Sequence, residues 1–146
     1  MEKSIESLTE SLNLTFRLSD RDWNQYSPLT LAYMGDAAYE LVIRSIFVKR
    51  ANMQVNKLHQ QVIACVSAKT QCRMIQYLLP FLNEEETAIY RRGRNSKPYT
   101  KAKNASLDEY LEATGLEAVI GFLYLKGEFN RMNELIRMGL AELDLL

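Results

Sequence analysis

The chain has 146 residues, of which 47% are hydrophobic, so one domain with a full core is expected and a wholly disordered chain is excluded. Six glycines and three prolines give few turn signals, which disfavours a barrel or sandwich of short strands. No apolar run approaches the roughly 18 residues needed to cross a bilayer. The N-terminus lacks the features of a secretory or transit peptide, so we expect a cytoplasmic protein without membrane contact.

The net charge is zero, but the charges are segregated along the chain. Residues 1–40 carry three Lys or Arg against seven Asp or Glu, residues 41–107 carry twelve against three, and residues 108–146 carry three against eight. The basic middle segment therefore predicts an anion-binding surface in a domain that is neutral overall.

The first half of the chain has clear helix signals. Residues 1–22 predict an N-terminal extension with a short amphipathic helix and a polar link. Ser27 as N-cap and Pro28 at the first helical position begin a helix whose apolar residues recur with helical spacing for about six turns. A second helix, or a pair of helices, is expected over 55–79, because Ser67 is able to cap a restart.

The second half continues with helices. Asn83 and the three glutamates after it form an N-cap with an acidic first turn, and that helix is predicted to end near Gly93 as its C-cap. After a polar loop, Ser106 begins the capping box of a long helix that Gly127 ends, and a last helix follows. No strand is indicated, so the predicted fold class is all-α, with one domain over 23–146.

The cysteines and the single histidine suggest no chemistry of their own. Cys65 and Cys72 are seven residues apart in one helical pattern, which predicts one helix face and a separation of about 10 Å, too far for a disulfide. His59 is the only histidine, so a zinc site with four Cys and His ligands is not expected. No sequence motif of a catalytic nucleophile lies near it. We expect buried free thiols and a histidine on a helix surface.

Two acidic residues lie in apolar helical stretches. Asp36 follows Gly35 among apolar neighbours, and Glu117 precedes eight uncharged residues. A carboxylate among apolar residues is costly unless it is paired or binds a metal. Glu117 therefore has two interpretations: the polar edge of a buried helix, or a ligand for a cation such as Mg²⁺ facing Asp36 across a helix contact. Glu40, four residues after Asp36, shares its helix face and by itself is interpreted as a solvated charge.

A basic tract without any acidic residue lies between Glu86 and Asp108. Such a run is often only a solvated face, but its one-sidedness in a neutral protein favours contact with nucleic-acid phosphates. No groove-reading DNA motif is present, so recognition of backbone or shape fits better. The candidate RNA-binding residues are Arg91, Arg92, Arg94, Asn95, Lys97, Lys101 and Lys103.

Several of these segments together resemble a known family. Residues 31–40 (LAYMGDAAYE) resemble the signature helix of ribonuclease III domains, and residues 117–125 (EAVIGFLYL) resemble their second acidic motif. Residues 59–68 (HQQVIACVSA), 91–95 (RRGRN) and 113–118 (ATGLEA) are similar to the compact Mini-ribonuclease III branch, which has no double-stranded-RNA-binding domain.

The resemblance covers about residues 24–140 and implies a single ribonuclease III-type helical bundle. It implies a homodimeric, Mg²⁺-dependent endoribonuclease that cleaves double-stranded RNA, leaves 5′-phosphate ends and matures the ends of the 23S ribosomal RNA precursor. Asp36 falls on the signature aspartate and Glu117 on the glutamate of the second motif, so both are expected to be catalytic and to bind the metal. The need for a ribosomal protein on the substrate stays open.

The chain departs from the larger ribonuclease III enzymes at two positions. Ala32 stands where they carry a glutamate one turn before the signature aspartate, and Thr114 stands where they carry an aspartate before the second-motif glutamate. The absence of these two carboxylates is typical of the Mini-ribonuclease III branch. It leaves the number of metal ions open, and it makes Glu40 and Thr114 candidates for supporting the metal ligands without replacing them.

Two other classes of protein remain as alternatives. A non-catalytic RNA-binding module with a ribonuclease III-like fold would bind RNA in a salt-sensitive way without cutting it. A helical protein-interaction domain would have no RNA affinity, and it leaves the basic tract unexplained.

Overall fold

The computed structural model describes residues 7–96 and 106–146, and within these ranges it contains helices and no strand. The predicted all-α fold class is therefore confirmed. The α-helices are α1 (Leu8–Phe16), α2 (Pro28–Arg50), α3 (Val55–Val66), α4 (Ala68–Leu78), α5 (Glu84–Arg94), α6 (Leu107–Lys126) and α7 (Phe129–Glu142). Two short 3-10 helices, η1 (Trp23–Gln25) and η2 (Leu79–Phe81), precede α2 and follow α4.

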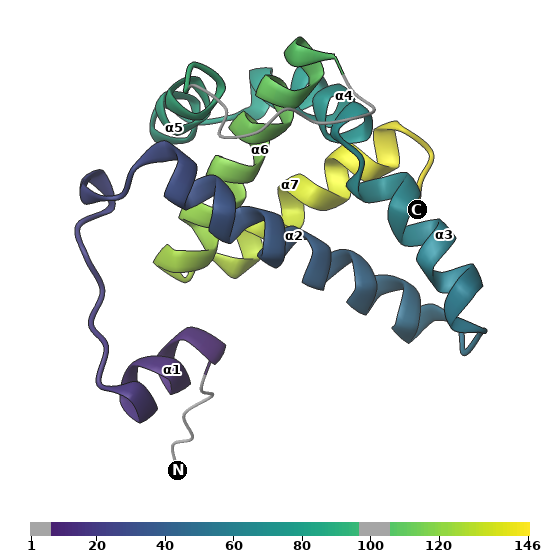
Figure 1. The fold of residues 1–146 in the computed structure, drawn as a ribbon, viewed down its shortest axis with the longest axis horizontal. Coiled ribbons are helices and arrows are strands. Elements are labelled where there is room, and N and C mark those ends of the chain that lie inside the picture. Colours follow the sequence, from purple (N-terminus) through teal and green to yellow (C-terminus); the bar gives the residue numbers. More distant parts are fainter. Residues whose placement is uncertain (1–6, 97–105) are drawn as a thin grey trace.

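The centre of the fold is the crossing of α2 and α6, which Figure 1 shows in the middle of the bundle. At this crossing the two backbones touch: a Cβ atom on Gly35 would lie 1.7 Å from the Glu117 carbonyl oxygen, and one on Gly121 would lie 1.9 Å from the Leu31 carbonyl oxygen. Only glycine permits this approach. The contact places Asp36, which follows Gly35, beside the turn of α6 that carries Glu117.

The predicted helix starts are confirmed by the caps. The Ser27 and Ser67 hydroxyls accept from the backbone N–H groups of the first turns of α2 and α4, while Asn83 and Ser106 form capping boxes at α5 and α6. Gly127 ends α6 with φ +79°, in the left-handed region that favours glycine.

The prediction that Gly93 is a C-cap is wrong. Gly93 lies inside α5, which runs on to Arg94 and is capped by Asn95 at φ −92°. Its role is packing, because a Cβ atom there would come within 2.9 Å of the Ala118 Cβ on α6 and within 3.2 Å of the Gly115 Cα. Cations before a glycine are typical of a helix end, but here the glycine lets α5 approach α6.

The segment 55–79 forms a pair of helices that meet at a tight corner. The Ser67 hydroxyl accepts from the Thr70 N–H at 3.2 Å, and the Thr70 hydroxyl donates to the Ala64 carbonyl at 2.7 Å, so the corner is tied on both sides. Cys65 therefore lies on α3 and Cys72 on α4, and the prediction of one shared helix face is wrong. Both thiols are free and buried, as expected.

A buried ion pair joins α5 to α7. Glu86 is 1% exposed and accepts two hydrogen bonds from Arg131, each at 2.9 Å, and one from the Asn83 N–H at 3.0 Å. Burial alone would raise the pKa of Glu86, but the hydrogen bonds from Arg131 and Asn83 and the Arg131 charge hold that pKa below its ordinary value. This pair fixes α5, whose C-terminal end begins the basic tract.

The N-terminal helix is the least embedded element. None of the residues of α1 is buried, and Figure 1 shows it beyond one edge of the bundle. The chain joins the body at Trp23, whose ring meets Phe122 edge-on at a centroid distance of 6.2 Å. Among the described residues, none of the helices combines the length and the apolar character that crossing a membrane requires.

Candidate active site

The two carboxylates singled out in the sequence meet at the α2–α6 crossing. Asp36 comes from the third turn of α2 and Glu117 from the middle of α6, and the two carboxyl groups are close enough for Asp36 to raise the pKa of Glu117. The pairing follows from the glycine contact described above, because Asp36 directly follows Gly35, the residue that touches the Glu117 backbone. The expected meeting of these two acids across a helix contact is therefore present.

The environments of the two acids differ from the expectation. Asp36 is exposed despite its apolar sequence neighbours, so the prediction that it is held among apolar side chains is wrong. Glu117 is the more buried of the two. Burial, the Asp36 charge and the hydrogen bond with Asp36 raise the pKa of Glu117 to about 9, against the opposing effect of a hydrogen bond from Gln71. Two carboxyl groups this close together favour holding a proton over carrying two negative charges.

The donor set fits a hard divalent cation. Two carboxylates that repel each other lose that repulsion when a cation binds between them, and Mg²⁺ commonly takes one or two protein carboxylates with phosphate and water as its other ligands. Within 7–96 and 106–146, no cluster of three or more His, Cys, Asp or Glu could enclose a metal. Asp36 and Glu117 therefore suit an open site shared with a phosphate, rather than a closed structural one.

The two candidate supporting residues make their hydrogen bonds elsewhere. Glu40 accepts from the Arg44 Nε at 2.8 Å, one turn further along α2. The buried Thr114 hydroxyl donates to the Tyr110 carbonyl at 2.9 Å within α6. Each lies about one turn from a carboxylate of the pair, and a supporting role for either stays a prediction.

Gln71 is the residue of this site that the sequence reasoning missed. It is 2% exposed on α4, which packs against α6, and its amide lowers the pKa of Glu117 against the larger effect of burial. The sequence does contain a signal for it. Gln71, Ile75 and Leu78 have the i, i+4, i+7 spacing of a buried helix face, so a polar residue occupies a position where an apolar one is expected.

Arg94, one of the candidate RNA-binding residues, is held by neighbouring acids. Its Nε donates to Glu112 at 2.7 Å, and its guanidinium lies 3.6 Å from Asp108. The Tyr90 hydroxyl donates to the same Glu112 at 2.6 Å. Burial and this hydrogen bond raise the pKa of Tyr90 to about 12. Arg94 thus joins the C-terminal end of α5 to the first turns of α6.

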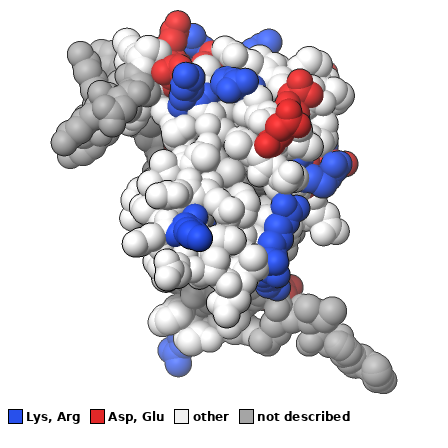
Figure 2. All heavy atoms as spheres, turned by 90° about the vertical axis from the view of Figure 1, so that its right-hand side faces the viewer, with Lys and Arg blue, Asp and Glu red and all other residues white. Residues whose placement is uncertain are grey.

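The other candidates for RNA contact divide into two groups. Arg91, Arg92 and Asn95 are exposed at the C-terminal end of α5. Lys97, Lys101 and Lys103 lie outside the described residues. On the α3 side of the molecule, Figure 2 shows Lys and Arg as separate spots on a largely uncharged face, rather than one continuous basic patch.

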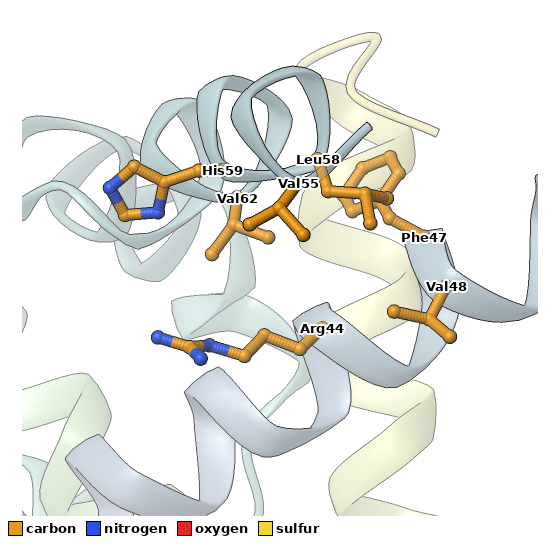
Figure 3. A pocket seen from close by; sticks show the side chains of 7 residues that line it. All are labelled: Arg44, Phe47, Val48, Val55, Leu58, His59 and Val62. Atoms are coloured by element: carbon orange, nitrogen blue, oxygen red, sulfur yellow. The ribbon is translucent and has the colours of Figure 1, made fainter. Parts of the chain in front are cut away.

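A small cleft of about 230 Å³ lies between α2 and α3. Figure 3 shows Arg44 and His59 at one end of it and apolar side chains, including Phe47 and Leu58, at the other. His59 is exposed on α3, as expected from the sequence. None of the residues that line the cleft is acidic, so it lacks the donors of the carboxylate site.

A comparison with protein families agrees with the fold. Residues 29–128 match the Ribonuclease III domain family, and this span contains both Asp36 and Glu117. The bundle is thus that of a ribonuclease III domain.

Individual relatives show to which branch of this family the chain belongs. The chain is 39% identical over 144 residues to a Mini-ribonuclease 3 of a Thermoanaerobacter species, covering 99% of both chains. It is 46% identical over 119 residues to that of Clostridium tetani, covering 81% of this chain and 79% of the relative. A crystal structure of a Fusobacterium nucleatum protein, 34% identical, superposes with a TM-score of 0.75 over 84% of this chain and 93% of that one. The chain therefore belongs to the Mini-ribonuclease 3 branch of the ribonuclease III family, a group of endoribonucleases.

Proposed function

We propose that this protein hydrolyses phosphodiester bonds in double-stranded RNA in a Mg²⁺-dependent reaction, with Asp36 and Glu117 as its catalytic metal ligands. The observation that carries the proposal is the pairing of an exposed and a partly buried carboxyl group where α2 and α6 touch. A purely RNA-binding protein would gain nothing from two acids held together near phosphates. The number of metal ions per site is left open.

The chain's own groups prepare the site in three ways. Asp36 presents a carboxylate at the surface, where an RNA phosphate can reach it. Because the pKa of Glu117 is raised, a metal that binds this carboxyl group must compete with a proton. The backbone contact of α2 with α6 fixes the distance between the two acids. A bound Mg²⁺ would stabilise charge on the phosphate and lower the pKa of its water, giving 5′-phosphate ends.

The RNA is proposed to lie along the basic tract. Arg91, Arg92 and Asn95 are exposed at the end of α5, which packs directly on the helix that carries Glu117. Lys97, Lys101 and Lys103 follow them in the sequence and are proposed to continue the phosphate contacts. Binding that depends on phosphate contacts weakens steeply with salt.

A homodimer is proposed as the working form. The exposed surface of α2 carries Tyr33, Leu41 and Val48, which are 82%, 55% and 58% exposed and recur at helical spacing. Such an apolar stripe on a surface is typical of an interface, and a second copy would give each strand of a duplex its own active site. Light scattering on the parent and on a Leu41→Arg variant tests this: a dimer for the parent and a monomer for the variant are expected.

The proposed task in the cell is maturation of the 23S ribosomal RNA precursor, which rests on the membership of the Mini-ribonuclease 3 branch. Purified precursor, with and without the ribosomal proteins that bind it, tests this task directly. Cleavage near the mature ends is expected, and a requirement for one added ribosomal protein would identify it as the substrate's partner.

The test of the reaction is cleavage of a long RNA duplex with Mg²⁺ and with chelator. The parent is compared with Asp36→Asn, Glu117→Gln and, as a matched control, Glu142→Gln in the exposed last turn of α7. Mg²⁺-dependent cutting by the parent and the control, lost in the other two variants, is expected. Tight RNA binding by the parent with no cutting under any divalent metal would favour the non-catalytic RNA-binding module.

A further inference from the structure

Glu112 of α6 holds the C-terminal end of α5. Its Oε1 accepts from the Tyr90 hydroxyl at 2.6 Å, and its Oε2 accepts from the Arg94 Nε at 2.7 Å. The Glu112 side chain is only 13% exposed. Hydrogen bonds of this length to an ionised carboxylate are among the strong ones in proteins. Both oxygens of one largely buried acid are therefore used to attach α5 to the helix that carries Glu117.

The Tyr90 ring is held as closely as its hydroxyl. It is buried against Gly115 of α6, where a Cβ atom would come within 2.7 Å of the ring carbon Cδ1. Glu112 and Gly115 are three residues apart and so lie on the same face of α6. The packing of the ring and the hydrogen bond of its hydroxyl together fix how the last turn of α5 lies on α6.

The residues that attach α5 alternate with residues that face solvent. Tyr90 and Arg94 are four residues apart and share the helix face that meets α6. Arg91 and Asn95 follow them directly, about 100° further around the helix, and both are exposed. Where Tyr90 and Arg94 are held therefore decides where Arg91 and Asn95 point.

We propose that Glu112 is a positioning residue for RNA binding: by holding Tyr90 and Arg94, it keeps Arg91 and Asn95 in place to contact the RNA backbone. The inference rests on the proposed function, in which the RNA lies along the basic tract. Arg94 then serves to anchor α5 and makes no phosphate contact of its own.

The first test is the sign of the change in RNA affinity in Glu112→Gln, measured with chelator so that the RNA is not cut. Loss of a negative charge beside phosphates would by itself tighten binding. A glutamine has one acceptor oxygen and cannot hold both Tyr90 and Arg94, so we expect about tenfold weaker binding. The matched control is Asp108→Asn, since Asp108 lies 3.6 Å from the same guanidinium but is 85% exposed. The control is expected to bind RNA as tightly as the parent or more tightly.

Kinetics and salt dependence supply further readouts. At saturating Mg²⁺, Glu112→Gln is expected to raise KM for RNA about tenfold with an unchanged kcat, because Asp36 and Glu117 are untouched. The slope of log RNA affinity against log salt should fall by about one as a phosphate contact is lost. A purely structural role would lower the melting temperature but leave KM and this slope unchanged in protein assayed well below it.

A second variant keeps the inference testable where Glu112→Gln does not fold. Tyr90→Phe keeps the ring against Gly115 and removes only the hydroxyl donor, so about threefold weaker RNA binding is expected. In a protein that already carries Arg91→Gln and Asn95→Ala, Tyr90→Phe should have no further effect on RNA affinity, because the contacts that it would displace are gone.

The outcomes separate the inference from the function on which it rests. If the parent neither binds nor cleaves double-stranded RNA, the proposed function fails and the role of Glu112 fails with it. If the parent does both, while Glu112→Gln and Tyr90→Phe bind RNA as tightly as the parent or more tightly, only the positioning role is overturned. A smaller salt slope in Arg94→Met, with Glu112→Gln like the parent, would also overturn it and assign the phosphate contact to Arg94 itself.

Discussion

Replacement of Glu117 by glutamine is expected to stabilise the metal-free protein at neutral and alkaline pH while abolishing cleavage. Burial, and then the Asp36 charge, raise the pKa of Glu117 from an ordinary value of 4.5 to about 9. The folded state therefore binds this proton more tightly than the unfolded chain. The contribution of this proton to the free energy of unfolding is complete below the ordinary pKa of 4.5, and it declines as the pH rises toward 9. Glutamine resembles the protonated acid and removes this decline.

The size of the stabilisation by Glu117→Gln follows from the pKa shift of Glu117. Each pH unit above the ordinary pKa corresponds to about 1.4 kcal/mol. At pH 7.5 the parent has therefore lost at most about 4 kcal/mol of its free energy of unfolding relative to low pH. Glu117 is only partly buried and is coupled to Asp36, and solvent screening reduces the effect to roughly 2 kcal/mol. In a domain of this size, that difference raises the melting temperature by about 6 °C.

Urea unfolding in the presence of chelator, followed by circular dichroism between pH 5.5 and 8.5, measures the effect. The advantage of Glu117→Gln over the parent should grow with pH, while the exposed Glu142→Gln should show none. Added Mg²⁺ should stabilise the parent and Glu142→Gln, which keep both ligands, but not Glu117→Gln. A variant that is less stable than the parent at pH 8.5, or an advantage that does not change with pH, would refute the reasoning.

Three further predictions concern the frame and the RNA contacts. Gly35→Ala should lose about 3 kcal/mol or more of stability in thermal unfolding, because its Cβ would overlap the α6 backbone at 1.7 Å; a loss under 1 kcal/mol would contradict the close crossing. Arg131→Met should lose about 3–5 kcal/mol at pH 7 by stranding the buried Glu86 charge. Since the pKa of Glu86 is lowered in the fold, the parent's stability should fall below about pH 4.5, and the variant should lack that part of the decline. Replacing Arg91 and Arg92 by glutamine should reduce the slope of log RNA affinity against log salt by about two; an unchanged slope would exclude both as phosphate contacts.

The helix boundaries were predictable because caps are local. Ser27, Ser67, Asn83 and Ser106 satisfy N–H groups within their own first turn, and Gly127 adopts a positive φ at the end of its own helix. No distant residue is needed for any of these signals, so short stretches of sequence predict them correctly.

What could not be predicted depends on contacts between helices. The apolar neighbours of Asp36 suggested burial, but they face the core or an open surface of α2, and Glu117 is the acid that lies deeper. Gly93 has the surroundings of a helix end, and only the presence of α6 shows that it is a packing residue. Gln71 was overlooked because a glutamine in a helix is usually exposed. The family resemblance identified the two carboxylates, whereas the structure adds how each is held.

Asp36 and Glu117 are proposed to bind a metal together at one site between α2 and α6. The most direct test is anomalous diffraction from crystals of the protein soaked in Mn²⁺ at pH 8, where displacing a proton from Glu117 costs less than at lower pH. We expect an anomalous peak in contact with both carboxylates, which disappears in Glu117→Gln crystals. A peak elsewhere, or none at this site in protein that cleaves RNA with Mn²⁺, would contradict it.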